Sequence, residues 1–336
     1  MSSVKKLGLF ILTCLLHVTI TAQEKESKNN FSITGSVDVY GTTNLADNAR
    51  GSIGILSSNS AGEGAHGFGL GMANTIFSYD LGKAGVVADL AFGPRANAAN
   101  AYEGSINQLY VYYKASDKIT VSLGQFNTFF GYEVISPVDN FNYSVSYLFN
   151  AGPFSHTGIK ADYQVSEDLS FMLAVTNPHA LTAGTNITND FQFGFQAGYK
   201  DQYLNIVYGA VDTSGIDDVF FIDYTGGFNA SESFYVGINA AYSNSSEADA
   251  GYYGAALYLQ NSFSDTFALG LRPEYFTTTA GSVDSSVLAL TLSANQSLTD
   301  KLKIIGEVRF DTSDDVPVIG TKENVTGLTL AAVYKF

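Results

Sequence analysis

Hydrophobic and polar residues alternate with a period of two along most of the chain. In the segment 191–200, FQFGFQAGYK, every second residue is apolar or aromatic and the residues between are Gln, Gly or Lys. The segment 301–311, KLKIIGEVRFD, shows a similar alternation, with charged residues on its polar face. Since successive side chains of a strand point to opposite faces, the pattern predicts β-strands with one apolar and one polar face.

Sixteen segments of the chain fit such strands. A strand that crosses a bilayer needs ~9–11 residues, and most of the segments reach that length. They are 31–42, 68–81, 84–93, 105–115, 119–126, 155–165, 168–177, 191–200, 202–211, 219–229, 233–243, 250–261, 265–276, 286–297, 301–311 and 324–336. The number is even, as is typical of single-chain bacterial barrels.

The connectors between these segments alternate between tight and long. Gly82-Lys83 and Asp201 are tight, for example, whereas 43–67 and 127–154 are long. Short turns at one end and long loops at the other are typical of outer-membrane barrels, and a soluble β-sandwich gives no reason for them. The pattern therefore predicts an all-β fold, a transmembrane antiparallel β-barrel of about 16 strands.

The N-terminus has the features of an export signal. Two lysines precede an apolar run of 14 residues, Leu7 to Ile20, and Ala22 suits a cleavage site. The run is too short to span a bilayer as a helix, which needs ~20 residues. We expect residues 1–22 to be a signal peptide, 23–30 a polar leader and 31–336 the barrel. The only cysteine, Cys14, lies in the signal, so disulfides and Cys–metal sites are not expected in the mature chain.

The charge pattern predicts a hydrated interior and an acidic outer mouth. The whole chain has a net charge of −15, which does not suit a general nucleic-acid binder. An ionised side chain facing lipid costs ~2–4 kcal/mol near the midplane, so charged strand residues should face the lumen. They include Arg272, Glu274, Lys303, Glu307 and Arg309. The outer connectors contain 15 acids against Arg50, Arg95 and Lys322, which predicts a mild preference for cations.

The longest connector, 127–154, is the strongest candidate for a functional element. It is rich in Asn and aromatic residues, and an exposed unstructured loop of this length is uncommon. Its phenylalanines need burial, which the lumen would provide; the alternative is packing across the mouth or against a neighbouring subunit. The residues expected to form a constriction are Phe129, Phe130, Glu133, Asp139, Phe141, Tyr143 and Phe149.

The stretch 124–158 resembles the β-barrel porins of the OmpL-like family, also called porin-2, of Bacteroidota. The matching residues are Gly124, Phe126, Thr128, Gly131, Glu133, Pro137, Asp139, Asn140, Tyr143, Ser144, Phe149, Gly152, Pro153, His156, Thr157 and Gly158. This match covers about a tenth of the chain. The resemblance implies a porin-type outer-membrane barrel with no cofactor and no established substrate, and it carries over no catalytic residue. No metal site is expected.

These features favour a passive diffusion channel for small hydrophilic solutes. A non-conducting structural or adhesin-type barrel, plugged by its loop, is the first alternative. A hydrolase at the rim is the second, although His66, His156 and His179 lie in no catalytic motif. The expected partners are outer-membrane lipid, lipopolysaccharide and the barrel-assembly machinery, which would read the terminal Phe336; such barrels are also often homo-oligomers.

Overall fold

The computed structural model describes residues 30–46, 54–55, 67–99, 105–178, 190–210, 218–245 and 247–336. The expected signal peptide, most of the first outer connector, His66 and His179 lie outside the described residues. Among the described residues, no helix is long and apolar enough to cross a membrane.

The chain forms one closed, antiparallel barrel of sixteen strands. The strands are β1 (Asn30–Asn44), β2 (Gly67–Asp80), β3 (Ala84–Phe92), β4 (Ile106–Ser116), β5 (Ile119–Asn127), β6 (Ser155–Gln164), β7 (Leu169–Thr176), β8 (Gln192–Tyr199), β9 (Gln202–Ala210), β10 (Asp218–Asn229), β11 (Phe234–Ser245), β12 (Ala250–Ser262), β13 (Phe267–Ala280), β14 (Val283–Ser297), β15 (Leu302–Thr312) and β16 (Asn324–Lys335). The predicted segments are confirmed, each bound lying within four residues of its prediction.

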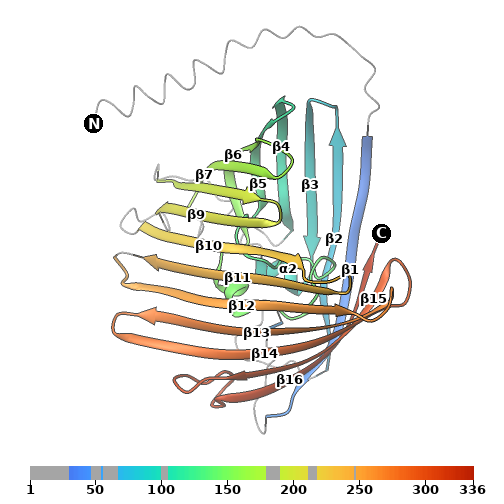
Figure 1. The fold of residues 1–336 in the computed structure, drawn as a ribbon, viewed down its shortest axis with the longest axis vertical. Coiled ribbons are helices and arrows are strands. Elements are labelled where there is room, and N and C mark those ends of the chain that lie inside the picture. Colours follow the sequence, from blue (N-terminus) through green and yellow to red (C-terminus); the bar gives the residue numbers. More distant parts are fainter. Residues whose placement is uncertain are drawn as a thin grey trace.

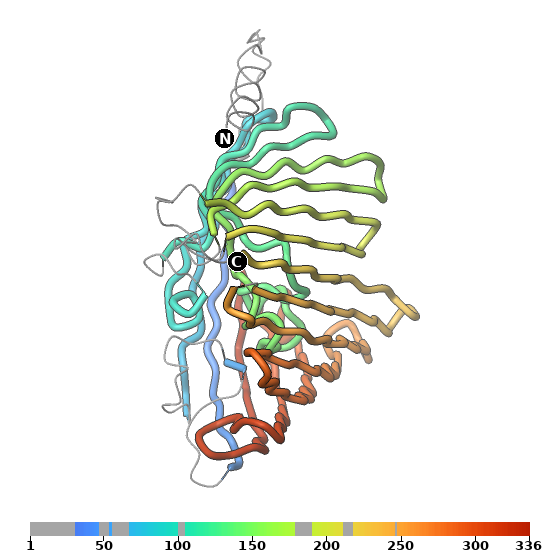
Figure 2. The backbone as a smooth tube through the Cα atoms, turned by 90° about the vertical axis from the view of Figure 1, so that its left-hand side faces the viewer, coloured from blue at the N-terminus to red at the C-terminus, as the bar shows by residue number. Residues whose placement is uncertain are grey.

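Each strand pairs with its sequence neighbours, and β1 closes the ring by pairing with β16, as in Ser36 opposite Lys335. Figure 1 shows β1–β5 running nearly vertically and β9–β14 nearly horizontally, because the strands tilt and these groups form different walls of the barrel. The tube in Figure 2 shows the segment after β5, in green, lying between the blue and the orange strands.

The alternation of side chains places polar residues inside the barrel and apolar residues outside. On β8, Phe193 is 60% exposed whereas its neighbour Gln192 is 1% exposed. On β15, Val308 and Phe310 lie on the exposed face, and the acids and the arginine between and beside them are buried. The apolar face therefore meets the surroundings, as in a barrel that crosses lipid rather than in a sandwich with an apolar core.

One outer connector is much shorter than the sequence predicted. Residues 277–285 were expected to form a long loop, but β13 and β14 continue to a turn at 281–282. Gly281 adopts a φ of 60° there, a left-handed conformation that glycine favours. The Thr and Ser residues on both sides continue the ladder, with Thr277 opposite Ser286 and Thr278 opposite Ser285. The long–short alternation is thus weaker than the sequence indicated.

Two short helices lie off the barrel wall. Helix α2 (Pro94–Ala99) follows β3 and contacts β2 and β3. Helix α3 (Tyr147–Ala151) belongs to the segment between β5 and β6 and contacts β12 and β13. Since the contacting residues of these strands face inward, the connector occupies the barrel interior.

Candidate functional site

The site is built on the connector 128–154, which we call the inserted loop. Its polypeptide has only one helical turn, α3, which begins because the Ser146 hydroxyl accepts a hydrogen bond from Phe149 N at 3.0 Å. Phe130 and Phe149 are 4% and 5% exposed. The prediction that this connector folds into the lumen is therefore confirmed.

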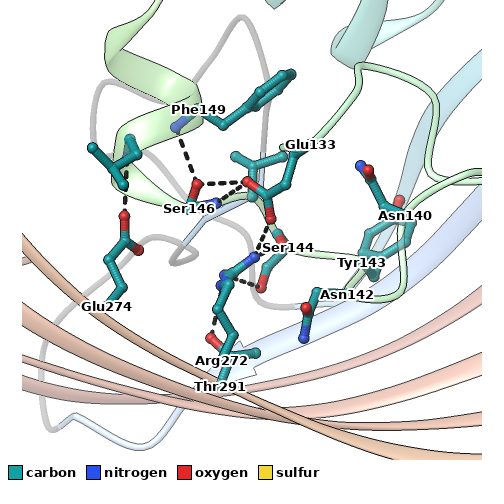
Figure 3. Close-up of polar contacts among 12 residues, drawn as sticks. Glu133, Asn140, Asn142, Tyr143, Ser144, Ser146, Phe149, Arg272, Glu274 and Thr291 are labelled. Carbon is teal, nitrogen blue, oxygen red and sulfur yellow. Dashed lines mark hydrogen bonds and ion pairs between the residues drawn. The ribbon is translucent and has the colours of Figure 1, made fainter. Parts of the chain in front are cut away.

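A buried ion pair joins the inserted loop to β13. The Arg272 guanidinium donates to the Glu133 carboxylate, and the two side chains are 0% and 3% exposed (Figure 3). Arg272 also donates to Ser144 O at 2.7 Å and to Thr291 Oγ1 at 3.2 Å. Because removing one partner of a buried pair leaves a charge without compensation, this contact is a main anchor of the loop.

Carboxylates of the wall accept hydrogen bonds from the backbone of the loop. Glu307 on β15 accepts from Tyr143 N at 3.0 Å and from Ser144 N at 2.9 Å. Glu274 on β13 accepts from Leu148 N at 2.9 Å, at the start of α3 (Figure 3). A loop with few internal backbone hydrogen bonds must find partners elsewhere when it is buried, and acidic strand residues provide them.

A second buried ion pair lies toward the outer end of β15. Arg309 Nε donates to Asp311 at 2.8 Å, and its Nη1 donates to Val145 O of the loop at 2.6 Å. The Tyr147 hydroxyl donates to Asp311 at 2.8 Å, and the Arg309 guanidinium lies 5.1 Å from the centre of the Tyr147 ring. The loop thus contacts charged groups along the length of β15.

The opposite side of the inserted loop packs against α2 and β1. The buried Arg95 donates to Tyr143 O at 3.1 Å and lies over the Tyr143 ring at 4.7 Å. Burial raises the pKa of the Tyr143 hydroxyl, which therefore stays protonated and donates to Asp38 on β1. Apolar residues complete this contact: Met72, Ala91, Ala96, Ala99, Ile135, Val145 and Phe149 form one buried cluster.

Aromatic rings of the loop pack against inward-facing glycines of the wall. A Cβ atom at Gly194 would lie 2.6 Å from the Phe129 ring, and one at Gly237 would lie 2.8 Å from the Tyr132 ring. The Phe141 ring would lie closer still to a Cβ atom at Gly270. Each glycine therefore leaves room for one ring, and any larger residue would displace it.

The remaining predicted residues are placed as follows. Phe129 stacks on His156 of β6 with ring centres 4.7 Å apart, and Asp139 is exposed within the lumen. Lys303 on β15 donates to Asn140 O at 3.2 Å. Phe336 lies at the short-turn end of β16, is 45% exposed on the outer face, and exchanges two backbone hydrogen bonds with Gly35.

The structure differs from the sequence-based prediction in what the charged, inward-facing strand residues contact. The alternation correctly places Arg272, Glu274, Glu307 and Arg309 inside, but they are 0–5% exposed and contact the loop instead of open lumen. Sequence reasoning did not predict the contacts of Arg95 and Asp38 with Tyr143, or the glycine contacts. Only Ser146, three residues before Phe149, carries a recognisable signal, that of a helix N-cap.

Comparison with known proteins agrees with this architecture. The sequence pattern of a family described as beta-barrel porin-2, OmpL-like, matches residues 30–336. A comparison with curated protein sequences finds no significant match.

Several solved structures share the fold. An anion-selective porin from Comamonas acidovorans has a TM-score of 0.64 at 13% identity, covering 92% of this chain and 100% of its own. The outer membrane channel DcaP of Acinetobacter baumannii has a TM-score of 0.63 at 11% identity, covering 94% and 100%. OmpT of Vibrio cholerae has a TM-score of 0.58 at 11% identity, covering 94% and 100%.

At such low identity these structures support the fold alone, whereas the family match extends over the whole barrel, inserted loop included. A barrel with an apolar outer face, a polar inner face and this family pattern is a protein of the bacterial outer membrane. The chain therefore belongs to the OmpL-like beta-barrel porin-2 family of outer-membrane porins.

Proposed function

We propose that this porin is a passive diffusion channel for small hydrophilic solutes, narrowed by its inserted loop. The carrying observation is that the loop buries the charged groups of β13 and β15, whereas two ion pairs on β2, β4 and β6 stay accessible. The ion pairs Arg272–Glu133 and Arg309–Asp311, beneath the loop, have side chains at most 4% exposed.

The ion pairs on β2, β4 and β6 are much more exposed to solvent than those beneath the loop. The side chains of Lys114 and Asp80 are 43% and 37% exposed, and those of Lys160 and Asp162 are 24% and 42% exposed. Inward-facing groups of a barrel can contact water only through the lumen or its mouth. Asp80 and Lys114 lie beside short turns, so Lys160, within β6, is the group whose exposure extends furthest into the barrel. This difference supports a solute path along the short-turn halves of β4 and β6, beside the inserted loop.

The mechanism requires no covalent step. A solute would pass by exchanging part of its hydration for contacts with polar side chains at the constriction, and the field of the charged groups would favour one sign of charge. We propose no catalytic residue in this chain. His156 is 2% exposed, lies 3.0 Å from Thr128 Oγ1 and is stacked against Phe129, an arrangement that suits packing of the loop.

Deleting residues 132–148 and joining the ends with a short Gly-Ser linker tests this function. If the loop narrows the pore, single-channel conductance of the folded variant should exceed that of the wild type. Heat modifiability provides the control that the barrel has assembled. Equal conductance of the wild type and a folded deletion variant would place the constriction elsewhere. If the wild type does not conduct and the deletion variant does, the result would favour a structural barrel that the loop plugs.

We also propose a mild cation preference, with a revised account of its source. Glu133 is neutralised by Arg272, so Asp139 is the loop acid that remains exposed. Reversal potentials in a salt gradient should show cation preference at low salt and a smaller preference for Asp139→Asn. The preference should fall as salt rises, because the screening length drops from ~10 Å at 0.1 M to ~3 Å at 1 M. An anion-selective wild type would contradict the proposal.

A further inference from the structure

A cavity of about 430 Å³ lies between the inserted loop and the strand ends that join the short turns. Its lining includes Tyr132 and Asp139 from the loop, with Tyr235, Gln260 and Lys303 from β11, β12 and β15. These strand residues lie within a few positions of the short turns, so the cavity opens on the side that faces the periplasm in barrels of this kind.

The cavity has a preformed wall. The Tyr132 ring stacks on Tyr258, with ring centres 3.9 Å apart and an angle of 19° between the planes. Gly237 leaves room for the edge of the same ring. The hydroxyl of Tyr132 interacts with the polar groups of Tyr235 and Gln260, so three polar side chains meet at this wall.

The charges around the cavity balance. Asp139 presents an exposed carboxylate, and Lys303 presents an ammonium group that donates to the carbonyls of Val138 and Asn140. Glu133, at the base, is already paired with Arg272. A site with one free acid and one base has no net charge to attract a single ion, but it provides both donors and acceptors.

The cavity volume lies within the ~300–1,000 Å³ typical of small-molecule sites. Hydroxyl, amide, carboxylate and ammonium groups converge on it beside the rings of Tyr132, Tyr235 and Phe141. A sugar combines many hydroxyls with apolar C–H faces that pack on aromatic rings. A solute with one dominant charge would leave the opposite charge of the site uncompensated.

We propose that this cavity binds a neutral, polyhydroxylated solute, a sugar of one or two rings, from the periplasmic side of the inserted loop. The inference deepens the proposed channel function and rests on it for the route by which the solute arrives. Binding itself does not depend on conduction, so the two proposals can fail separately.

Saturation-transfer NMR on the folded full-length barrel in detergent, with maltose as the probe, tests the site directly. Transfer to maltose should be clear for the wild type, and its dissociation constant should rise about fivefold or more in Gln260→Leu, the loss of one hydrogen bond. Asp139→Asn should weaken binding as well. Asp265→Asn, in an exposed short turn outside the cavity, is the matched control and should bind like the wild type.

The outcomes separate the alternatives. No transfer to maltose, or transfer unaffected by both cavity variants, overturns the site. Stronger transfer to glycylglycine or to inorganic phosphate than to maltose overturns the sugar class. Conductance without maltose binding would remove this inference and leave the channel, whereas maltose binding without conductance would keep the site and remove the channel.

Discussion

The ion pair between Glu133 and Arg272 should determine how firmly the inserted loop is held in the lumen. Glu133→Gln keeps the shape of the side chain and removes its charge. Arg272 is 0% exposed and would then keep neutral hydrogen-bond partners, among them Ser144 O and Thr291 Oγ1, in place of the carboxylate. Breaking a buried pair in this way costs about 3–5 kcal/mol, and release of the loop would relieve that cost by hydrating Arg272.

A buried reporter in the loop measures this release. Val145 is 3% exposed, and the chain has no cysteine apart from Cys14 in the expected signal peptide, so Val145→Cys gives a single thiol that reacts with a maleimide only when the loop opens. If opening and closing are fast relative to labelling, the rate follows the opening equilibrium. A change of 3–5 kcal/mol predicts a labelling rate about two to four orders of magnitude higher in the Glu133→Gln background.

The exposed pair Lys160–Asp162 provides the matched control. Exposed pairs contribute about 0–1 kcal/mol, so Asp162→Asn should change the labelling rate by less than about fivefold. Combining Glu133→Gln with Arg272→Gln should restore part of the slow labelling, because the uncompensated Arg272 charge is then removed as well. A folded Glu133→Gln variant that is labelled as slowly as its parent would refute the view that this pair holds the loop.

Three further predictions concern the barrel itself. An epitope tag inserted at Gly281, in an outer turn, should be reachable by antibody on intact cells, and one at Asp117, in a short turn, should not; the reverse would invert the orientation. Deleting Phe336, which pairs with the first strand at the closure of the ring, should lower the heat-modifiable folded fraction in the membrane, and an undiminished fraction would make it an ordinary terminal residue. Gly237→Ala should lower thermal stability by about 1–3 kcal/mol, because its methyl group would overlap the loop tyrosine that packs there. Gly306→Ala should leave thermal stability unchanged, because the space around its Cβ position is open. Equal effects of the two variants would show that the contact between Gly237 and the loop tyrosine does not contribute to stability.

The sequence by itself determined the barrel. Alternation with a period of two is a local property, because each strand residue points to the face opposite to its neighbours whatever the strand pairs with. Segments such as 191–200 and 301–311 therefore showed which side chains face inward before any pairing was known. The length and aromatic content of 127–154 likewise indicated a connector that requires burial.

Only the tertiary structure decided what the inward-facing groups contact. Glu133 and Arg272 are 139 residues apart in sequence, and no local pattern indicates that they meet. The inward position of Glu307 could be predicted, but whether it faces water or accepts from the loop backbone depends on where that loop lies. The packing of Tyr132 against Gly237 is equally non-local, since a glycine matters here only through the ring that approaches it. Strand alternation fixes the direction of a side chain, whereas its partner depends on contacts between distant parts of the chain.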